Sequence, residues 1–176
     1  MEGSPSFTMI SLGLLVGRLV LGLAMAAHGS QKLFGWFGGH GLAGTAGYFE
    51  SVGFRPGRPL AKLAGLAEFT GGILTVLGLF GPLGPALIIA VMVVAMTQHA
   101  GNGFFAMNNG IETPLLYLAG ALVLAVTGFG RYSLDAALDL AELHQPVVVS
   151  TAVAVAVLGG LASIALRRAR ADARAG

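Results

Sequence analysis

Five long apolar stretches constrain this chain more than any other feature of its sequence. They run roughly from Ile10 to Leu33, Leu60 to Phe80, Leu83 to Gln98, Pro114 to Thr127 and Val147 to Leu166. A helix rises about 1.5 Å per residue, so about 20 apolar residues cross the roughly 30 Å of hydrocarbon in a bilayer. The third and fourth stretches are short, and we expect flanking residues to extend them. The sequence therefore predicts an all-α fold, a polytopic transmembrane bundle that crosses the membrane five times.

The composition supports a membrane location. Of the 176 residues, 55% are hydrophobic and 10% are charged, which leaves too little polar surface to cover a soluble core. The formal net charge is +2, and the basic residues fall in loops and a tail, so we expect no nucleic-acid partner. The chain has no cysteine, which excludes disulfides, thiolate metal sites and CxxC redox relays.

Prolines and positive charges predict how the stretches are connected and oriented. The segment Gly81-Pro82-Leu83-Gly84-Pro85 predicts a tight turn, because proline lacks an amide proton and disfavours helix in the residue before it. Basic residues favour cytoplasmic loops, which predicts an external N-terminus and an internal C-terminus. With five crossings, the internal residues are Lys32, Arg55, Arg58, Lys62, Arg167, Arg168, Arg170 and Arg174, and the external one is Arg131.

Two loops rich in glycine and aromatic residues fall on the internal side. The first runs over residues 34–59 and the second over residues 101–110. Aromatic side chains favour the headgroup layer of a membrane, so we expect the first loop to lie in the interface with a short helix from Ala43 to Val52. Together the two loops are expected to cover the internal end of the bundle.

Several motifs resemble those of the DoxX family of small bacterial membrane proteins. They are the run Arg18 to Lys32 continuing into Leu33-Phe34-Gly35, Gly44-Thr45, Tyr48-Phe49, Val52-Gly53-Phe54, Ala67-Glu68, Gly71-Gly72, His99, and Thr127 to Asp135. The resemblance covers roughly Gly13 to Leu138. The final apolar stretch and its arginine tail depart from typical members, which resemble a four-helix bundle.

The resemblance implies a domain division, a location and a role. Residues 1–138 would form a DoxX-like four-helix bundle, and residues 139–176 a linker, an additional transmembrane helix and a basic cytoplasmic tail. The location implied is the inner membrane of a bacterium. DoxX-type subunits resemble parts of thiosulfate:quinone oxidoreductase, and other members are linked to oxidative-stress assemblies with superoxide dismutase and a sulfurtransferase. A quinone-facing role with soluble redox enzymes as partners is therefore implied.

Ionisable residues inside the apolar stretches are the candidate functional residues. Each costs about 2.5–3.5 kcal/mol in a bilayer on insertion scales, so it must face the interior, find a partner or reach the surface. Helical spacing places Arg18, Met25, His28 and Lys32 on one face, and Met92, Met96 and His99 on another. Counted from the helix ends, five polar residues meet at one level near the internal side: His28, Lys32, Glu68, His99 and Glu112. Arg18 is expected nearer mid-membrane, where it needs a carbonyl, a ligand or Glu68 as its partner.

These residues suggest a quinone site with proton transfer. His28, Glu68 and His99 are the candidate catalytic residues, because histidine titrates near neutrality and a glutamate can carry protons. Arg18, His28, Lys32, His99 and Glu112 are the candidate quinone-binding residues. A metal or haem held by His28, His99 and Glu68 is a weaker alternative, because the paired Glu-x-x-His motifs of di-iron bundles are absent and methionine in a helix more often fills core space.

Structural roles for the same residues stay open. Lys32 can extend to the headgroups, Glu112 can favour the first turn of a helix, and Glu68 can hold the bundle together through Lys32 or His28. His40 and His144 are expected in solvated loops, and Asp135, Asp139 and Glu142 on the polar side of a short external helix. The alternative function is a non-catalytic membrane scaffold that docks soluble enzymes on its basic cytoplasmic side. Association into a homo-oligomer is a further hypothesis that the sequence leaves undecided.

Overall fold

The computed structural model describes the backbone of residues 5–175 and the side chains of residues 5–167. The long helices are α1 (Pro5–Phe34), α2 (Gly41–Ser51), α3 (Gly57–Leu77), α4 (Leu83–His99), α5 (Glu112–Thr127) and α7 (Pro146–Ala175). Short elements are α6 (Leu134–Ala137) and the 3-10 turns η1 (Trp36–Gly38), η2 (Ala100–Asn102), η3 (Ala106–Asn108) and η4 (Ala141–His144). No strand occurs in this part of the chain, and the all-α prediction is confirmed. The side chains of Arg168, Arg170 and Arg174 lie outside the described residues.

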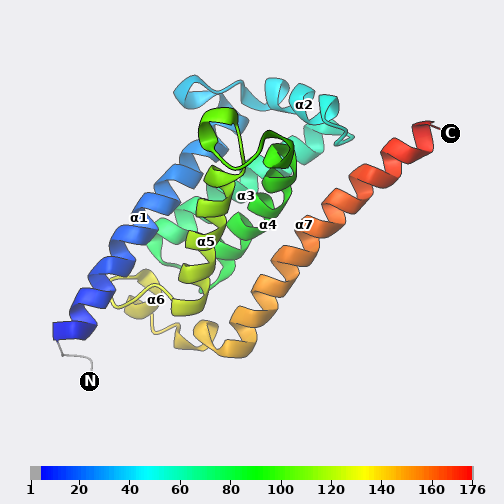
Figure 1. Cartoon of the computed structure of the whole chain (residues 1–176). Helices are drawn as coiled ribbons and strands as arrows, with labels where there is room; N and C mark the ends of the chain where they lie inside the picture. The colour runs from blue at the N-terminus through cyan, green and yellow to red at the C-terminus, as the bar shows by residue number, and fades with distance from the viewer. Residues whose placement is uncertain (1–4, 176) are drawn as a thin grey trace.

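The helices form a bundle in which α3 packs on α1 and α4, and α4 also packs on α5 and α7. Figure 1 shows α2 lying across one end of the bundle and α6 at the other; we call these the α2 end and the α6 end. The first helix begins at the α6 end and the last one finishes at the α2 end (Figure 1). The predicted short helix in the first loop is confirmed as α2, one or two residues earlier than expected.

Among the described residues, four helices are long and apolar enough to cross a membrane: Pro5–Phe34, Gly57–Leu77, Leu83–Asn102 and Pro146–Arg167. The fifth predicted span, α5, has 16 residues and so measures about 24 Å. Large apolar side chains such as Val20 on α1 and Leu158 on α7 are exposed on the outside of the bundle, as a bilayer-facing surface requires. The chain is therefore an all-α helical membrane protein.

Glycines allow α1 and α3 to approach closely. A Cβ atom on Gly22 of α1 would lie 2.7 Å from the carbonyl oxygen of Gly72, and one on Gly72 would lie 2.5 Å from the carbonyl oxygen of Gly22. Farther along the same seam, a Cβ on Gly65 would lie 2.8 Å from the side chain of Leu33. Small residues at helix contacts give the close van der Waals packing on which helix association in membranes depends.

The predicted turn between the second and third stretches is confirmed, although α3 ends three residues earlier than expected. Gly78 adopts a left-handed conformation with φ 61°. The amide of Leu79 bonds the Leu74 carbonyl at 3.0 Å and that of Gly78 bonds the Thr75 carbonyl at 3.2 Å. This Schellman arrangement ends the helix at Leu77, because a left-handed residue cannot continue it.

Substitution of a glycine on the α1–α3 seam should destabilise the bundle. We expect Gly72→Ala to lower the free energy of unfolding by about 1–3 kcal/mol, because its methyl group would overlap backbone atoms of α1 that cannot move aside. Thermal unfolding in detergent micelles measures the change. The matched control is Gly13→Ala on α1, where no atom lies within 4 Å of the added methyl group and no loss is expected. Equal stability of Gly72→Ala and the wild type would contradict the close packing.

Candidate functional site

Polar side chains from α1, α3, α4 and α5 meet around a cavity of about 260 Å³ at the α2 end. We call it the α2-end cavity. Its lining consists of His28, Lys32, Glu68, Met92, Ala95, His99, Ala106, Asn109, Gly110, Thr113, Pro114 and Tyr117. The structure thus brings together four residues that the sequence analysis had proposed: His28, Lys32, Glu68 and His99. The remaining two, Arg18 and Glu112, lie outside this lining.

Lys32 and Glu68 form an ion pair across the α1–α3 seam. The Lys32 Nζ lies 2.5 Å from the Glu68 Oε2. The Glu68 side chain is only 2% exposed, whereas that of Lys32 is 27% exposed. A carboxylate this deeply buried needs a charged partner, and the close approach of α1 to α3 places the lysine ammonium against it. The structure therefore gives Lys32 a partner inside the bundle.

His28 lies beside Tyr117 of α5. Its Nε2 is 3.5 Å from the Tyr117 hydroxyl oxygen, and the two rings meet edge to face with centroids 5.7 Å apart. Sequence reasoning missed Tyr117. The available signal was that Tyr117 is the one aromatic residue in α5. Its hydroxyl adds a group to the cavity that can donate or accept a hydrogen bond.

His99 and Glu112 both hold the loop over residues 100–111, which covers one side of the cavity. The Nδ1 of His99 lies 2.7 Å from the carbonyl oxygen of Asn109. The Oε2 of Glu112 accepts a hydrogen bond from the Ala106 amide at 2.8 Å. Gly110 packs so tightly that a Cβ would lie 2.5 Å from the Phe104 carbonyl oxygen. Glu112 thus contacts the loop but does not line the cavity. The helix α2 contributes no residue to the cavity lining either.

The histidines and acidic residues do not form a metal cluster in the part of the chain whose side chains are described. No group of three or more His, Asp or Glu side chains there is close enough to hold a metal ion. Of the methionines, Met92 lines the cavity, Met25 is fully buried in the core and Met96 is half-buried.

Arg18 lies toward the α6 end. It is ten residues before His28 on α1, about 15 Å along the helix axis. The residue is 4% exposed, and its guanidinium donates a hydrogen bond from Nη2 to the Tyr132 carbonyl. Its Nε and Nη1 have no hydrogen-bond partner among the described residues, and Asp135 is close enough to interact electrostatically. Of the three partners expected for Arg18, the structure supplies a backbone carbonyl.

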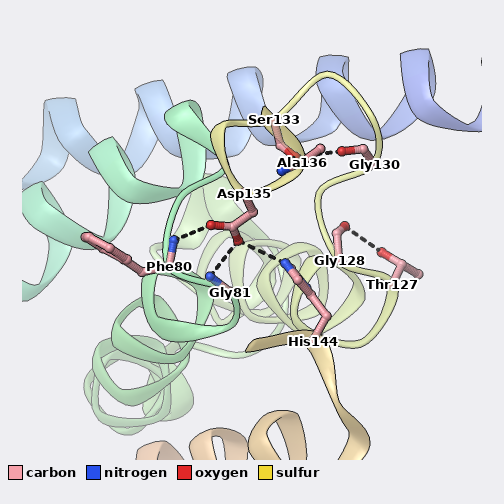
Figure 2. A network of polar contacts seen from close by, with 9 residues as sticks. All are labelled: Phe80, Gly81, Thr127, Gly128, Gly130, Ser133, Asp135, Ala136 and His144. Carbon is pink, nitrogen blue, oxygen red and sulfur yellow. Dashed lines mark hydrogen bonds and ion pairs between the residues drawn. The ribbon is translucent and has the colours of Figure 1, made fainter. Parts of the chain in front are cut away.

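Asp135 is the centre of a polar network at the α6 end (Figure 2). Its Oδ1 accepts from the Phe80 amide at 2.8 Å, and its Oδ2 accepts from the Gly81 amide at 2.7 Å. The Nε2 of His144 lies 2.9 Å from the same Oδ2. One carboxylate thereby connects the α3–α4 turn, α6 and η4.

The expectation that His144 lies in a solvated loop is wrong, and so is the expectation that Asp135 lies on the polar side of a short external helix. Asp135 is 3% exposed and the His144 side chain 27%, because the network draws both against the α3–α4 turn. A second cavity of about 290 Å³ lies beside this network, and its polar lining comprises Thr127, Ser133, Asp135, Asp139 and His144. Since three donors already occupy the Asp135 oxygens, we interpret the network as structural.

Comparisons with known proteins identify similar membrane proteins. The DoxX family profile matches residues 13–101, which begins at the same residue as the resemblance seen in the motifs and ends before Leu138. An uncharacterised membrane protein of Mycobacterium tuberculosis, Rv3486, is 33% identical over 145 residues, 76% of this chain and 82% of the relative. The inner membrane protein YqjF of Escherichia coli is 31% identical over 134 residues, 73% of this chain and 93% of the relative. No solved structure is significantly similar to this chain.

Loss of the Asp135 charge should destabilise the α6 end. In Asp135→Asn, an amide NH₂ replaces one accepting oxygen and meets a donor, so we expect the free energy of unfolding to fall by about 3 kcal/mol. Thermal unfolding in detergent measures the change. The control, Asp139→Asn, alters an exposed aspartate of the same segment and should stay within about 0.5 kcal/mol of the wild type. Equal effects of the two substitutions would contradict the anchoring role of Asp135.

Proposed function

Because this chain belongs to the DoxX family of membrane proteins, we propose that it is an integral membrane subunit of a redox system. In this proposal the α2-end cavity binds the headgroup of a quinone. The observation that carries the proposal is the convergence of His28, Lys32, Glu68 and His99 on that one cavity. Intramembrane ionisable residues around a cavity are functional candidates by default, because lipid penalises them elsewhere.

The size and lining of the cavity fit a small ring better than a large ligand. Its volume of about 260 Å³ lies just below the range of roughly 300–1000 Å³ that is typical of sites for drug-sized ligands. The apolar part of the lining, Met92, Ala95 and Pro114, can contact the faces of a ring. A quinone with a long tail would leave that tail among the lipids.

Three side chains supply the proposed chemistry. Because both residues line the cavity, His28 and His99 would hydrogen-bond the oxygens of the headgroup, and an imidazole can take up or release a proton. Glu68 would exchange protons with the bound headgroup, while Lys32 holds its carboxylate in position through the 2.5 Å contact. Arg18 and Glu112 would act indirectly in this proposal, by fixing the α6 end and the 100–111 loop.

A quinone should accompany the purified protein. We expect organic extraction of protein purified in mild detergent, followed by chromatography, to yield a quinone from the wild type. His28→Ala and Glu68→Gln should reduce its amount about tenfold, since each removes a hydrogen-bonding group from the cavity. The control His40→Ala changes an exposed histidine outside the cavity and should retain the quinone. Elemental analysis of the same samples tests the metal alternative.

A second candidate function is a non-catalytic scaffold. The observation in its favour is that Arg55, Arg58 and Lys62 are all exposed near the start of α3, where they offer a basic surface to acidic soluble enzymes. The extraction experiment separates the two functions. A wild type without quinone, together with His28→Ala and Glu68→Gln variants that fold and function normally, would reject the quinone site and favour the scaffold.

The finer location is also a proposal: the inner membrane of a bacterium, with the N-terminus outside and the C-terminus inside. One relative is described as an inner membrane protein. The basic residues Lys32, Arg55, Arg58 and Lys62 lie at or near the α2 end, and the Arg167 guanidinium reaches the same end, 5.2 Å from the centre of the Phe54 ring. Positive charges favour the cytoplasmic side, so the α2 end would face the cytoplasm.

Reporter fusions test this orientation. A reporter attached after Gly176 should give a cytoplasmic signal. One placed in the α3–α4 turn should give an external signal, because α3 crosses the membrane between its cytoplasmic start and that turn. Alkaline phosphatase and green fluorescent protein report the two sides. An external signal from the C-terminal fusion would contradict the five-span, C-in arrangement.

A further inference from the structure

The α2-end cavity is lined by more free hydrogen-bond acceptors than free donors. The inference rests on the proposed quinone site and concerns which redox form of the headgroup the site prefers. An oxidised quinone carries two carbonyl oxygens that only accept hydrogen bonds. A hydroquinone carries two hydroxyl groups, which donate. The cavity can therefore discriminate between them by the groups that it leaves free.

His99 presents an acceptor to the cavity. The Asn109 carbonyl 2.7 Å from its Nδ1 can only accept a hydrogen bond, so Nδ1 carries the proton. In the neutral ring the other nitrogen, Nε2, is then unprotonated and accepts. No hydrogen bond to Nε2 forms within the described part of the chain, and His99 is one of the residues that line the cavity.

Glu68 presents a second acceptor from a different helix. Its Oε2 is bonded to Lys32, and no donor among the described side chains meets its Oε1. Oε1 is not among the fully buried side-chain atoms that lack a hydrogen-bond partner. Since Oε1 has no partner in the protein, some of its surface must be accessible, and Glu68 lines the cavity. A carboxylate oxygen accepts strong, charge-assisted hydrogen bonds.

The other polar groups of the lining do not reverse this balance. Lys32 is the lining side chain that can only donate, and its ammonium is engaged by Glu68. The hydroxyls of Tyr117 and Thr113 can donate or accept. The same is true of the His28 imidazole, whose Nε2 lies 3.5 Å from the Tyr117 hydroxyl oxygen, and of the Asn109 amide, so these four groups suit either form of a ligand. The Ala106 and Gly110 amides are bonded to Glu112 and to the Phe105 carbonyl.

We infer that the α2-end cavity is selective for the reduced, dihydroxy form of the quinone headgroup, with Glu68 Oε1 and His99 Nε2 accepting its two hydroxyl groups. The oxidised form would set carbonyl oxygens against these two acceptors. A buried acceptor facing another acceptor loses its hydrogen bond without regaining water, which is how sites built for a hydroxyl reject ligands that lack it.

Anaerobic binding measurements test the inference. The wild-type protein in lipid nanodiscs is equilibrated at pH 8 with decylubiquinol or with decylubiquinone, and binding to empty nanodiscs is subtracted. We expect the quinol to bind at least about tenfold more tightly than the quinone. Tighter or equal binding of the quinone would overturn the inference and leave the proposed function standing. Saturable binding of neither form would overturn the proposed function itself.

Two variants test the assigned acceptors. In His99→Asn, the side-chain amide can still donate to the Asn109 carbonyl, while Nε2 is removed, so the preference for the quinol should fall about tenfold. Glu68→Gln replaces a carboxylate by an amide that can also donate, and it should shift the preference toward the quinone. His40→Asn is the matched control and should keep the wild-type preference. If Glu68→Gln does not fold, His99→Asn decides alone, and an unchanged preference in that variant would overturn the role of His99.

Discussion

The ion pair between Lys32 and Glu68 depends on how closely α1 and α3 approach each other. Both helices carry glycines where they meet, at Gly22 and Gly72, and a Cβ atom at either position would overlap the opposing backbone. At that separation a lysine near the end of α1 reaches a carboxylate about three turns inside α3. Wider packing would leave Glu68 in an apolar environment with no counter-ion, which lipid penalises by several kcal/mol.

The charges of the bundle separate into two groups at opposite ends. At the α2 end, Lys32 and Glu68 stand beside two histidines that line a cavity. At the α6 end, the oxygens of Asp135 are occupied by the α3–α4 turn and by His144. The Asp135 carboxylate is saturated with partners inside the protein, although Arg18 at the same end keeps two buried nitrogens without one; the groups at the α2 end remain free around a cavity. That difference is why we place the proposed chemistry at the α2 end and a structural role at the α6 end.

Much of the fold was predictable because its signals are local. Apolar runs fixed the helices to within a few residues at most ends, and two prolines fixed the turn before α4. The inward-facing stripes were correct for Arg18, Met25 and Met92, all of which are buried, because helical periodicity alone determines which residues share a face. The early end of α3 was missed, since a left-handed Gly78 cannot be distinguished by sequence from the other glycines nearby.

The parts of the site that were missed depend on contacts between distant segments. Asp135 looks like an exposed residue of a short polar helix, and its burial follows from a turn 54 residues earlier. Tyr117 gave no periodic signal, and only the packing of α5 against α1 brings it to His28. Arg18 shares a face with His28, yet their separation along the helix axis assigns them to different ends. The height of a residue along the bundle axis is harder to predict than the helix face on which it lies, because the height depends on where each helix begins.

A double-mutant cycle on Lys32→Met and Glu68→Gln tests most directly the central claim that the buried charges are paired within the bundle. Unfolding free energies are measured for both single variants and for the double variant in the same detergent. The account predicts that Lys32→Met is the more damaging single change, because it leaves the 2% exposed Glu68 side chain without its counter-ion. It also predicts that adding Glu68→Gln recovers stability, with a coupling of more than about 1 kcal/mol. Additive losses from the two substitutions would contradict it.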